Sequence, residues 1–132
     1  MSQSQLPSPQ TPRPDVYAAL CPSREILSLI GEKWTALIVG ALEQKVMRFG
    51  ELKRVCDGIS QKMLTQTLRR LERDGLVTRT LYADVLPVKT EYRLTELGRS
   101  LLPVVRAAKD WAEANLFQIQ HNRAAYNQNH KQ

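Results

Sequence analysis

Polar side chains able to contact nucleic acid recur through residues 59–79, "ISQKMLTQTLRRLERDGLVTR". Seven of them follow a serine: Gln61, Lys62, Thr65, Gln66, Arg69, Arg70 and Arg73. A helix through this stretch places three leucines on one face and most of these polar residues on the opposite face, with Arg70 on the flank. Glutamine and lysine can read base edges in the major groove, and arginine binds guanine or phosphate. The pattern indicates noncovalent recognition of nucleic acid; the alternative is an ordinary solvated helix face.

The position of each residue along this helix predicts its role. In a helix-turn-helix, the N-terminal residues of the second helix meet the base edges. Ser60 is expected to cap the helix and to belong to the same DNA-facing set. Base readout is then expected from Gln61, Lys62, Thr65 and Gln66. Arg69 can reach a base or a phosphate, whereas Arg70 and Arg73 are expected to hold phosphates and fix the register.

The distribution of charge favours a polyanionic partner. The chain has 132 residues and a formal net charge of +6. Residues 48–93 carry ten Lys or Arg and six Asp or Glu, a net +4, and arginine outnumbers lysine among them. Basic charge gathered in one segment points first to nucleic acid, and here to double-stranded DNA. The alternative is a solvated basic surface.

Residues for catalysis or metal binding are scarce. The two cysteines, Cys21 and Cys56, are too far apart in sequence for a zinc motif and do not form a disulfide framework. Both histidines, His121 and His130, lie close to the C-terminus. No acid, base and nucleophile set converges, so we expect no enzymatic activity, no metal and no cofactor.

The ends of the chain are polar. Residues 1–16 hold four prolines among Ser, Gln and Thr, which predicts a disordered or extended N-terminal arm. Residues 121–132 are expected to be a polar tail, leaving 17–120 as the folded unit. No apolar run is long enough to span a membrane, and the start lacks the pattern of a secretory signal. We therefore expect a cytoplasmic protein without a membrane partner.

Helix and turn signals predict five helices and a hairpin. Pro22 suits the first turn of a helix that ends near Gly31, and a core-facing helix follows from about residue 32. A short extended piece at 46–48 precedes a third helix led by Phe49. The charged helix then ends at Asp74-Gly75, and "LVTRTLY" and "TEYRLT" alternate as paired strands. A last helix begins after Thr95.

This order predicts a mainly α fold with a small β-hairpin, the α+β arrangement of a winged helix-turn-helix. The hairpin is the wing. Arg79 and Arg93 on its strands and Lys89 near its tip are expected to contact DNA, with Lys89 lying over phosphates or entering the minor groove. The alternative for Arg79 and Arg93 is ion pairing with Glu91 or other acidic residues of the same sheet.

The last helix carries more apolar residues than a small core needs. Pro103 should bend it or split it in two. Its excess apolar face is expected to form a homodimer interface, together with the first helix. The interface residues are expected to be Leu101, Val104, Val105, Ala108 and Trp111. Trp34 and Trp111 are both expected to serve packing rather than ligand stacking.

Several short motifs occur in order between residues 20 and 112. They are Cys-Pro, Gly-x-Lys-Trp, Arg-Phe-x-Glu-Leu, Gly-Ile-Ser, Leu-x-x-Leu-x-x-Asp-Gly-Leu and Val-x-x-Glu-Tyr-x-Leu-Thr, with a terminal Trp. Together they resemble the HxlR-type (DUF24) winged-helix transcriptional regulators, relatives of the MarR group. The resemblance implies a bacterial dimeric regulator of inverted-repeat operators. The wing departs mildly from the family at Leu86-Pro87-Val88, where two prolines are frequent.

The resemblance also implies a role for Cys21. Several family members sense oxidants or electrophiles through a cysteine at this position. A thiol near a helix N-terminus, with Arg24 one turn on, should have its thiolate favoured. The alternative is an inert structural thiol. Cys56 is either a resolving partner from the other subunit, since some members use a second cysteine, or a core residue.

Three functional hypotheses follow. The leading one is a homodimeric DNA-binding regulator, taken to be a repressor, whose affinity for an inverted-repeat operator changes when an oxidant or electrophile modifies Cys21. The second is the same regulator controlled by a small apolar or aromatic ligand. The third is a winged-helix protein-interaction module with no DNA role.

Overall fold

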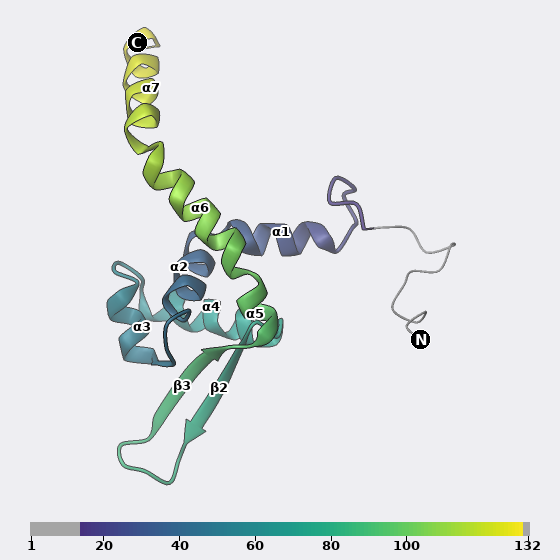
Figure 1. Ribbon diagram of the computed structural model, residues 1–132, viewed down its shortest axis with the longest axis vertical. Helices are drawn as coiled ribbons and strands as arrows, with labels where there is room; N and C mark the ends of the chain where they lie inside the picture. Colours follow the sequence, from purple (N-terminus) through teal and green to yellow (C-terminus); the bar gives the residue numbers. More distant parts are fainter. Residues whose placement is uncertain (1–13, 131–132) are drawn as a thin grey trace, which may run out of the picture.

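The computed structural model describes residues 14–130, which form seven helices and three strands. Figure 1 shows how the helices and the hairpin are arranged. The helices are α1 (Ser23–Gly31), α2 (Lys33–Ala41), α3 (Phe49–Val55), α4 (Gln61–Arg73), α5 (Glu96–Ser100), α6 (Leu102–Ala114) and α7 (Leu116–Asn129). The strands are β1 (Met47–Arg48), β2 (Val77–Tyr82) and β3 (Lys89–Leu94). Residues 1–13 of the expected N-terminal arm lie outside the described residues.

The helices α2, α3 and α4 enclose the core, and the hairpin closes it from below (Figure 1). Ile38, Leu52, Leu64 and Leu71 are completely buried. Trp34 is half-buried and packs against this cluster, as the sequence predicted. Burial of these aliphatic side chains supplies the main stabilising free energy and fixes α4 against α2 and α3.

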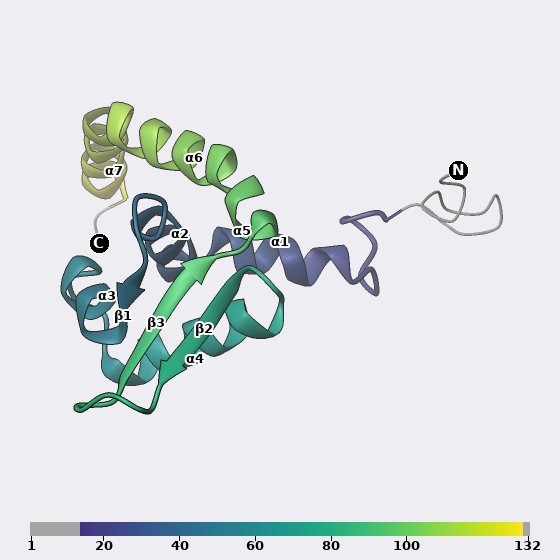
Figure 2. The same ribbon diagram turned by 60° about the horizontal axis from the view of Figure 1, so that its bottom comes forward.

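A three-stranded antiparallel sheet carries the wing. Its strand order is β1-β3-β2, and the two residues of β1 pair with Tyr92 and Glu91 in the middle of β3, which leaves the far part of the hairpin free. Val77 pairs with Leu94 and Tyr82 with Lys89, which makes a six-residue ladder. Figure 2 shows β2 and β3 running together away from the helices. The winged helix-turn-helix expected from the sequence is confirmed.

The exit from α4 depends on a glycine. Gly75 has a φ of 80°, in the left-handed region that L-residues with side chains seldom adopt. The Leu76 amide then donates to the Leu71 carbonyl at 2.9 Å, closing the helix in the Schellman pattern. Only Leu76 separates Gly75 from β2, so the direction of the hairpin is fixed by the end of α4. The predicted Asp-Gly ending is confirmed.

The last helical segment is split, as expected from Pro103. A break at Leu101 separates α5 from α6, and Pro103 occupies the first turn of α6, where a missing amide costs no hydrogen bond. The helix α6 packs on α2, with Val105 against Gly40 and an ion pair between Arg106 and Glu43. The segment therefore docks on the DNA-binding lobe at its start and leaves it further on.

The boundary expected at residue 120 is not a structural one. The helix α7 crosses it and continues to Asn129, without burying any residue. Alanine and glutamine favour helix, and side-chain pairs one turn apart support it, such as Gln118 donating to Asn122 at 3.0 Å. The expected polar tail, 121–132, is thus polar but helical to Asn129.

We expect Gly98→Ala to destabilise the fold strongly. A methyl group at this buried position would overlap the Leu76 carbonyl oxygen and lie 3.1 Å from the carbonyl carbon. The cost should be about 3 kcal/mol of unfolding free energy, the upper end of typical overpacking penalties. Urea unfolding at one fixed protein concentration measures it. Gly31→Ala is the matched control, because open space surrounds that position; its effect should stay below about 1 kcal/mol. Equal stabilities for the two variants would contradict the prediction.

Candidate nucleic-acid interface

The helix α4 begins at a defined cap and seats on a narrow face. Ser60 has extended backbone, and its hydroxyl accepts from the Met63 amide at 3.0 Å. This contact satisfies one of the free amides of the first turn. The buried face consists of Leu64, Thr67, Leu68 and Leu71. The Thr67 hydroxyl donates to the Met63 carbonyl at 2.8 Å, so this polar residue is buried without an unmet hydrogen bond.

The opposite face of α4 is free for a partner. Its exposed residues are Gln61, Lys62, Gln66, Arg69 and Arg73, and Thr65 lies half-buried beside them. Arg73 pairs with its neighbour Asp74 at 3.0 Å, a contact that remains open to solvent and is weak. The structure therefore gathers six of the sequence-predicted residues on one accessible helix surface. We call these six residues the α4 outer face.

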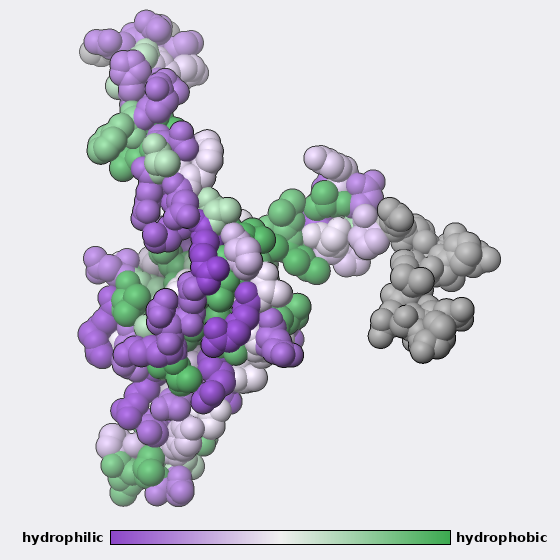
Figure 3. All heavy atoms as spheres, viewed as in Figure 1, coloured by the Kyte–Doolittle hydropathy of each residue, from purple (hydrophilic) through white to green (hydrophobic). Residues whose placement is uncertain are grey.

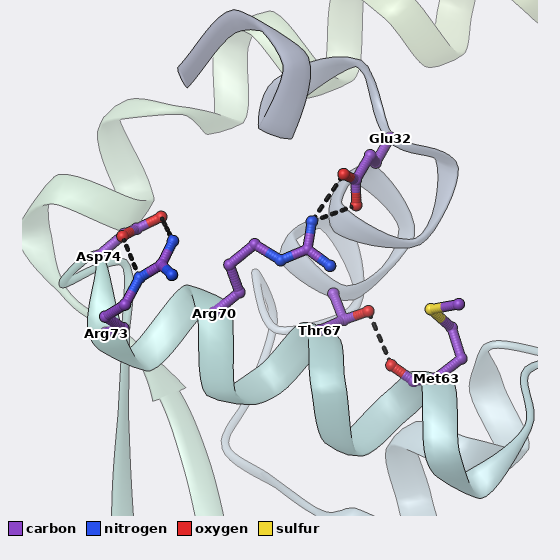
Figure 4. Close-up of polar contacts among 6 residues, drawn as sticks. All are labelled: Glu32, Met63, Thr67, Arg70, Arg73 and Asp74. Atoms are coloured by element: carbon purple, nitrogen blue, oxygen red, sulfur yellow. Dashed lines mark hydrogen bonds and ion pairs between the residues drawn. The ribbon is translucent and has the colours of Figure 1, made fainter. Parts of the chain in front are cut away.

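Arg70 does not belong to the α4 outer face. Figure 4 shows its guanidinium directed toward the turn between α1 and α2, where one nitrogen lies 2.6 and 2.7 Å from the two carboxylate oxygens of Glu32. In this conformation Glu32 holds the guanidinium, and the expected phosphate contact of Arg70 stays a prediction. The physical reason is helical spacing, since Arg70 lies one turn beyond Thr67 and shares its side of α4. The pair ties α4 to the end of α1.

The predicted basic residues of the wing divide between two faces of the hairpin. Arg79 is on the face that packs against α4, and its Nε lies 3.5 Å from Glu72. Arg93 and Lys89 are on the other face, because side chains alternate along a strand. Lys89 lies 3.7 Å from Glu91 and 4.9 Å from the Tyr82 ring centroid. Arg93 is exposed and has no ion pair among the described residues.

A hollow of about 270 Å³ lies between α4 and the wing. It is lined by Phe49, Thr65, Leu68, Arg69, Glu72, Arg79 and Tyr92. It brings Arg69 and Arg79 to one site, although ten residues separate them in sequence. Glu72 was not among the predicted site residues, because the prediction considered residues that could bind DNA and an acidic residue did not qualify. Its position one turn after Leu68, close to the start of the hairpin, could have indicated that it lies near the wing. Glu72 neutralises Arg79 while no partner is bound.

The Cys21 thiol sits just before α1 in a polar setting. Its Sγ lies 2.9 Å from the Ser23 hydroxyl and accepts from the Asp15 amide at 3.2 Å. The hydrogen bond to Ser23, followed by backbone hydrogen bonds, lowers the pKa of Cys21 below its usual value. Arg24, expected to help, instead donates to the carbonyls of Val16 and Tyr17 at 3.2 and 2.8 Å. It holds the preceding loop and not the thiolate.

Cys56 has the opposite environment. It ends α3, is only 2% exposed and belongs to the core cluster. Burial raises its pKa, which leaves the thiol protonated and unreactive at neutral pH. In this conformation Cys56 acts as a core residue, the alternative that the sequence left open.

The residues expected at a dimer interface divide between the core and the surface. Leu101 and Val105 point into the protomer and are buried in its own core. Val104, Ala108 and Trp111 are exposed on α6. Trp111 is 62% exposed, so its expected packing role is not met within one protomer. Ile26 and Leu27 of α1 are also exposed. The sequence predicted that the first helix takes part in the interface but did not single out these two residues.

Residues 14–130 lack two further classes of site. Within that range there is no group of three His, Cys, Asp or Glu side chains that could hold a metal ion. The same range contains no helix that is long and apolar enough to cross a membrane.

Comparison with known proteins gives consistent matches. The family model described as "HxlR-like helix-turn-helix" matches residues 29–120. The "Uncharacterized HTH-type transcriptional regulator YtfH" of Escherichia coli (strain K12) is 42% identical over 119 residues, 90% of this chain and 93% of that protein.

Solved structures agree with the sequence matches. A putative transcriptional regulator ytfH from Salmonella typhimurium is similar at a TM-score of 0.79 and 41% identity, covering 85% of this chain and 99% of that one. The redox regulator HypR in its reduced form has a TM-score of 0.68 at 41% identity, covering 76% and 98%.

We expect Ser23→Ala to slow alkylation of Cys21. Removing the hydroxyl removes the largest stabiliser of the thiolate, so the pKa should move up toward the ordinary thiol value. The pH at which iodoacetamide labelling reaches half its maximal rate should rise, and the rate at neutral pH should fall. Cys56 is the internal control and should be labelled only after unfolding. A pH profile identical to that of the parent protein would show that Ser23 does not set this pKa.

Proposed function

The chain belongs to the HxlR-like helix-turn-helix family, and from this membership we propose that it acts as a homodimer on an inverted-repeat DNA operator, where it represses transcription. It is a helix-turn-helix transcriptional regulator, with a DNA-binding and not an enzymatic role. The observation that carries the proposal is the α4 outer face, a continuous row of hydrogen-bonding side chains beside a wing.

Recognition is proposed to begin at the N-terminal half of α4. Gln61, Lys62 and Gln66 can reach base edges, and Thr65 lies beside them. Arg69, one turn further on, reads a base or binds a phosphate from the rim of the hollow that it shares with Arg79. Arg73 and Arg93 are proposed to contact phosphates, and Arg79 joins them once DNA competes with Glu72.

Dimerisation is proposed to use α6 and α1. Val104 and Trp111 form an apolar surface on α6 that no residue between 14 and 130 covers. Ile26 and Leu27 add a second apolar surface on α1. A two-fold pairing through these helices would bury both and would present two copies of α4 to two half-sites. A single α4 reads only a few base pairs, so the dimer also supplies affinity.

Control is proposed to act through Cys21. The lowered pKa makes its thiolate the better nucleophile of the two cysteines, and it stands at the start of α1. The similarity to HypR, described as a redox regulator, supports an oxidant or electrophile as the signal. The helix α1 meets α4 through Glu32 and Arg70, which links the segment that carries the thiol to the helix proposed to read DNA. Cys56 would have to become exposed before it could act as a resolving partner.

A second mode of control has its own support. A cavity of about 650 Å³ lies between α1, the end of α4 and α5. Its lining is mainly apolar, with Ile26, Leu29, Leu76, Leu97 and Leu101. The Glu32–Arg70 contact forms part of its wall. A small apolar or aromatic ligand in this cavity is therefore the alternative effector.

We expect Arg69→Ala to weaken operator binding. An inverted repeat selected from a pool of random duplexes serves as the operator, and the loss should be about 1–3 kcal/mol if Arg69 reads a base. Arg123→Ala, which removes the same charge from the exposed α7, is the matched control and should have little effect. Mobility shifts on operator and random DNA measure both. An equal loss on the two DNAs assigns Arg69 to a phosphate, and affinity that does not fall with salt would favour the protein-interaction module.

We expect Trp111→Ala to weaken the dimer. Removing a large aromatic anchor from an interface should cost at least about 2 kcal/mol. Tyr126→Ala is the matched control, because its ring is equally exposed but lies near the end of α7. Sedimentation velocity over a range of concentrations gives the dissociation constants. Unchanged dissociation in the Trp111 variant would move the interface away from α6.

We expect diamide or a quinone to change the operator affinity of the parent protein and to leave Cys21→Ser unaffected. The serine hydroxyl keeps the size of the side chain but cannot be oxidised or alkylated under these conditions. Mobility shifts on the selected operator, before and after treatment, provide the measurement. A response that persists in Cys21→Ser would exclude control through this thiol and would favour a ligand in the cavity.

A further inference from the structure

The far end of the wing is apolar and open to solvent. We call residues 83–88, which connect β2 to β3, the wing tip. Leu86 is 91% exposed, and Val85 and Val88 are also exposed. Leu81, at the adjoining end of β2, adds to the same surface. Figure 3 shows hydrophobic side chains gathered at the lower end of the molecule, where Figure 1 places this loop. Exposed clusters of this kind mark contact surfaces.

The charges around the wing tip do not suit a phosphate contact. Asp84 is the only charged residue within it, and a carboxylate repels phosphate. Lys89 follows the loop, but it lies within 3.7 Å of Glu91 and against the Tyr82 ring, with its side chain 30% exposed. It is held on the hairpin and does not extend from the tip. The part of DNA that matches this surface is therefore not its backbone charge.

The position of the wing tip suits the minor groove. The hairpin leaves the C-terminal end of α4 after three residues, 74–76, and six residues of strand carry the tip about 20 Å away. The minor groove lies roughly 17 Å, or half a turn of B-DNA, from the centre of the major groove. In Figures 1 and 2 the tip is also remote from α6 and α7, so the proposed dimer surfaces do not cover it.

We propose that the wing tip enters the minor groove beside each half-site as an apolar wedge, with Leu86 pressed against a base step, and that it bends the operator. Leucine and proline are among the residues that open base steps in this way. Pro87 restricts the loop backbone, which lowers the entropy lost when Leu86 becomes ordered. Val85 and Val88 then lie against the sugars. This inference rests on the proposed DNA-binding function.

Two properties follow if the wing tip binds as an apolar wedge. The wing tip adds affinity without releasing counterions, so it contributes nothing to the salt dependence of binding. Opening a base step is easiest at pyrimidine–purine steps, so the operator should favour such a step where the tip lies. The tip would thus contribute to specificity through deformability without hydrogen bonds to bases.

The test uses the full-length protein and the inverted repeat selected from random duplexes. One set of duplexes carries 2-aminopurine at successive positions, and another carries donor and acceptor dyes at its ends. The parent protein should raise 2-aminopurine fluorescence at one symmetric pair of positions and should raise energy transfer between the ends. Leu86→Ala should lose both signals and about tenfold in affinity, the order expected when a leucine leaves a nonpolar contact.

Two further variants discriminate the wedge from other contacts. Leu86→Met should retain both signals, since methionine can also open a base step. Leu86→Lys should lose both signals but steepen the log–log salt dependence by about 0.9, because it adds one phosphate contact. Circular dichroism and sedimentation confirm that all variants remain folded and equally associated.

Several outcomes would overturn the inference. Signals that persist in Leu86→Ala, or that are absent in a parent protein that binds the operator, would show that the wing tip is not a wedge. Association of the parent protein that Leu86→Ala abolishes would assign the tip to protein contact instead. A parent protein with no preference for any selected DNA would refute the proposed function as well, and is recognised by binding alone.

Discussion

One junction holds the three working parts of this molecule together. At the end of α4, the Thr95 hydroxyl donates to the Gly75 carbonyl at 2.6 Å and accepts from the Gly98 amide at 3.0 Å. The Thr95 amide also donates to the Leu76 carbonyl at 3.1 Å. One side chain therefore caps α5, binds the exit turn of α4 and stands at the end of β3. The reading helix, the wing and the segment leading to α6 all take their directions from this point.

The basic surface is balanced by nearby carboxylates. Arg70 is held by Glu32, Arg79 by Glu72 and Lys89 by Glu91. The pair between Arg70 and Glu32 has structural consequences because it is partly shielded and links two helices. The pair between Arg79 and Glu72 lies where DNA is proposed to bind, so a phosphate would compete with a carboxylate for the same cation. Net charge alone overstates how many cations are ready to bind.

Local chemistry made much of the fold predictable. Ser60, Gly75 and Pro103 act through backbone geometry within a few residues, and the structure follows each of them. The direction of Arg70, the contact of Glu72 with Arg79 and the burial of Leu101 depend on which element packs alongside. Such relations between distant residues leave no periodic pattern in the sequence. Residues 121–129 of α7 were expected to be part of a tail because a helix without a buried face shows no apolar stripe.

The break at Leu101 has a consequence for the scale on which this protein can be switched. The segment α5 is anchored to the DNA-binding lobe by Thr95, whereas α6 carries the surface proposed for pairing. A small rotation of α6 on α2, where Val105 and Arg106 dock it, would change the distance between the two copies of α4 in proportion to the angle and to the length of the lever between them. Successive base pairs are about 3.4 Å apart along B-DNA. A displacement of that size would leave one helix in phase with its half-site and the other one base pair out, which is enough to release the operator without unfolding either lobe.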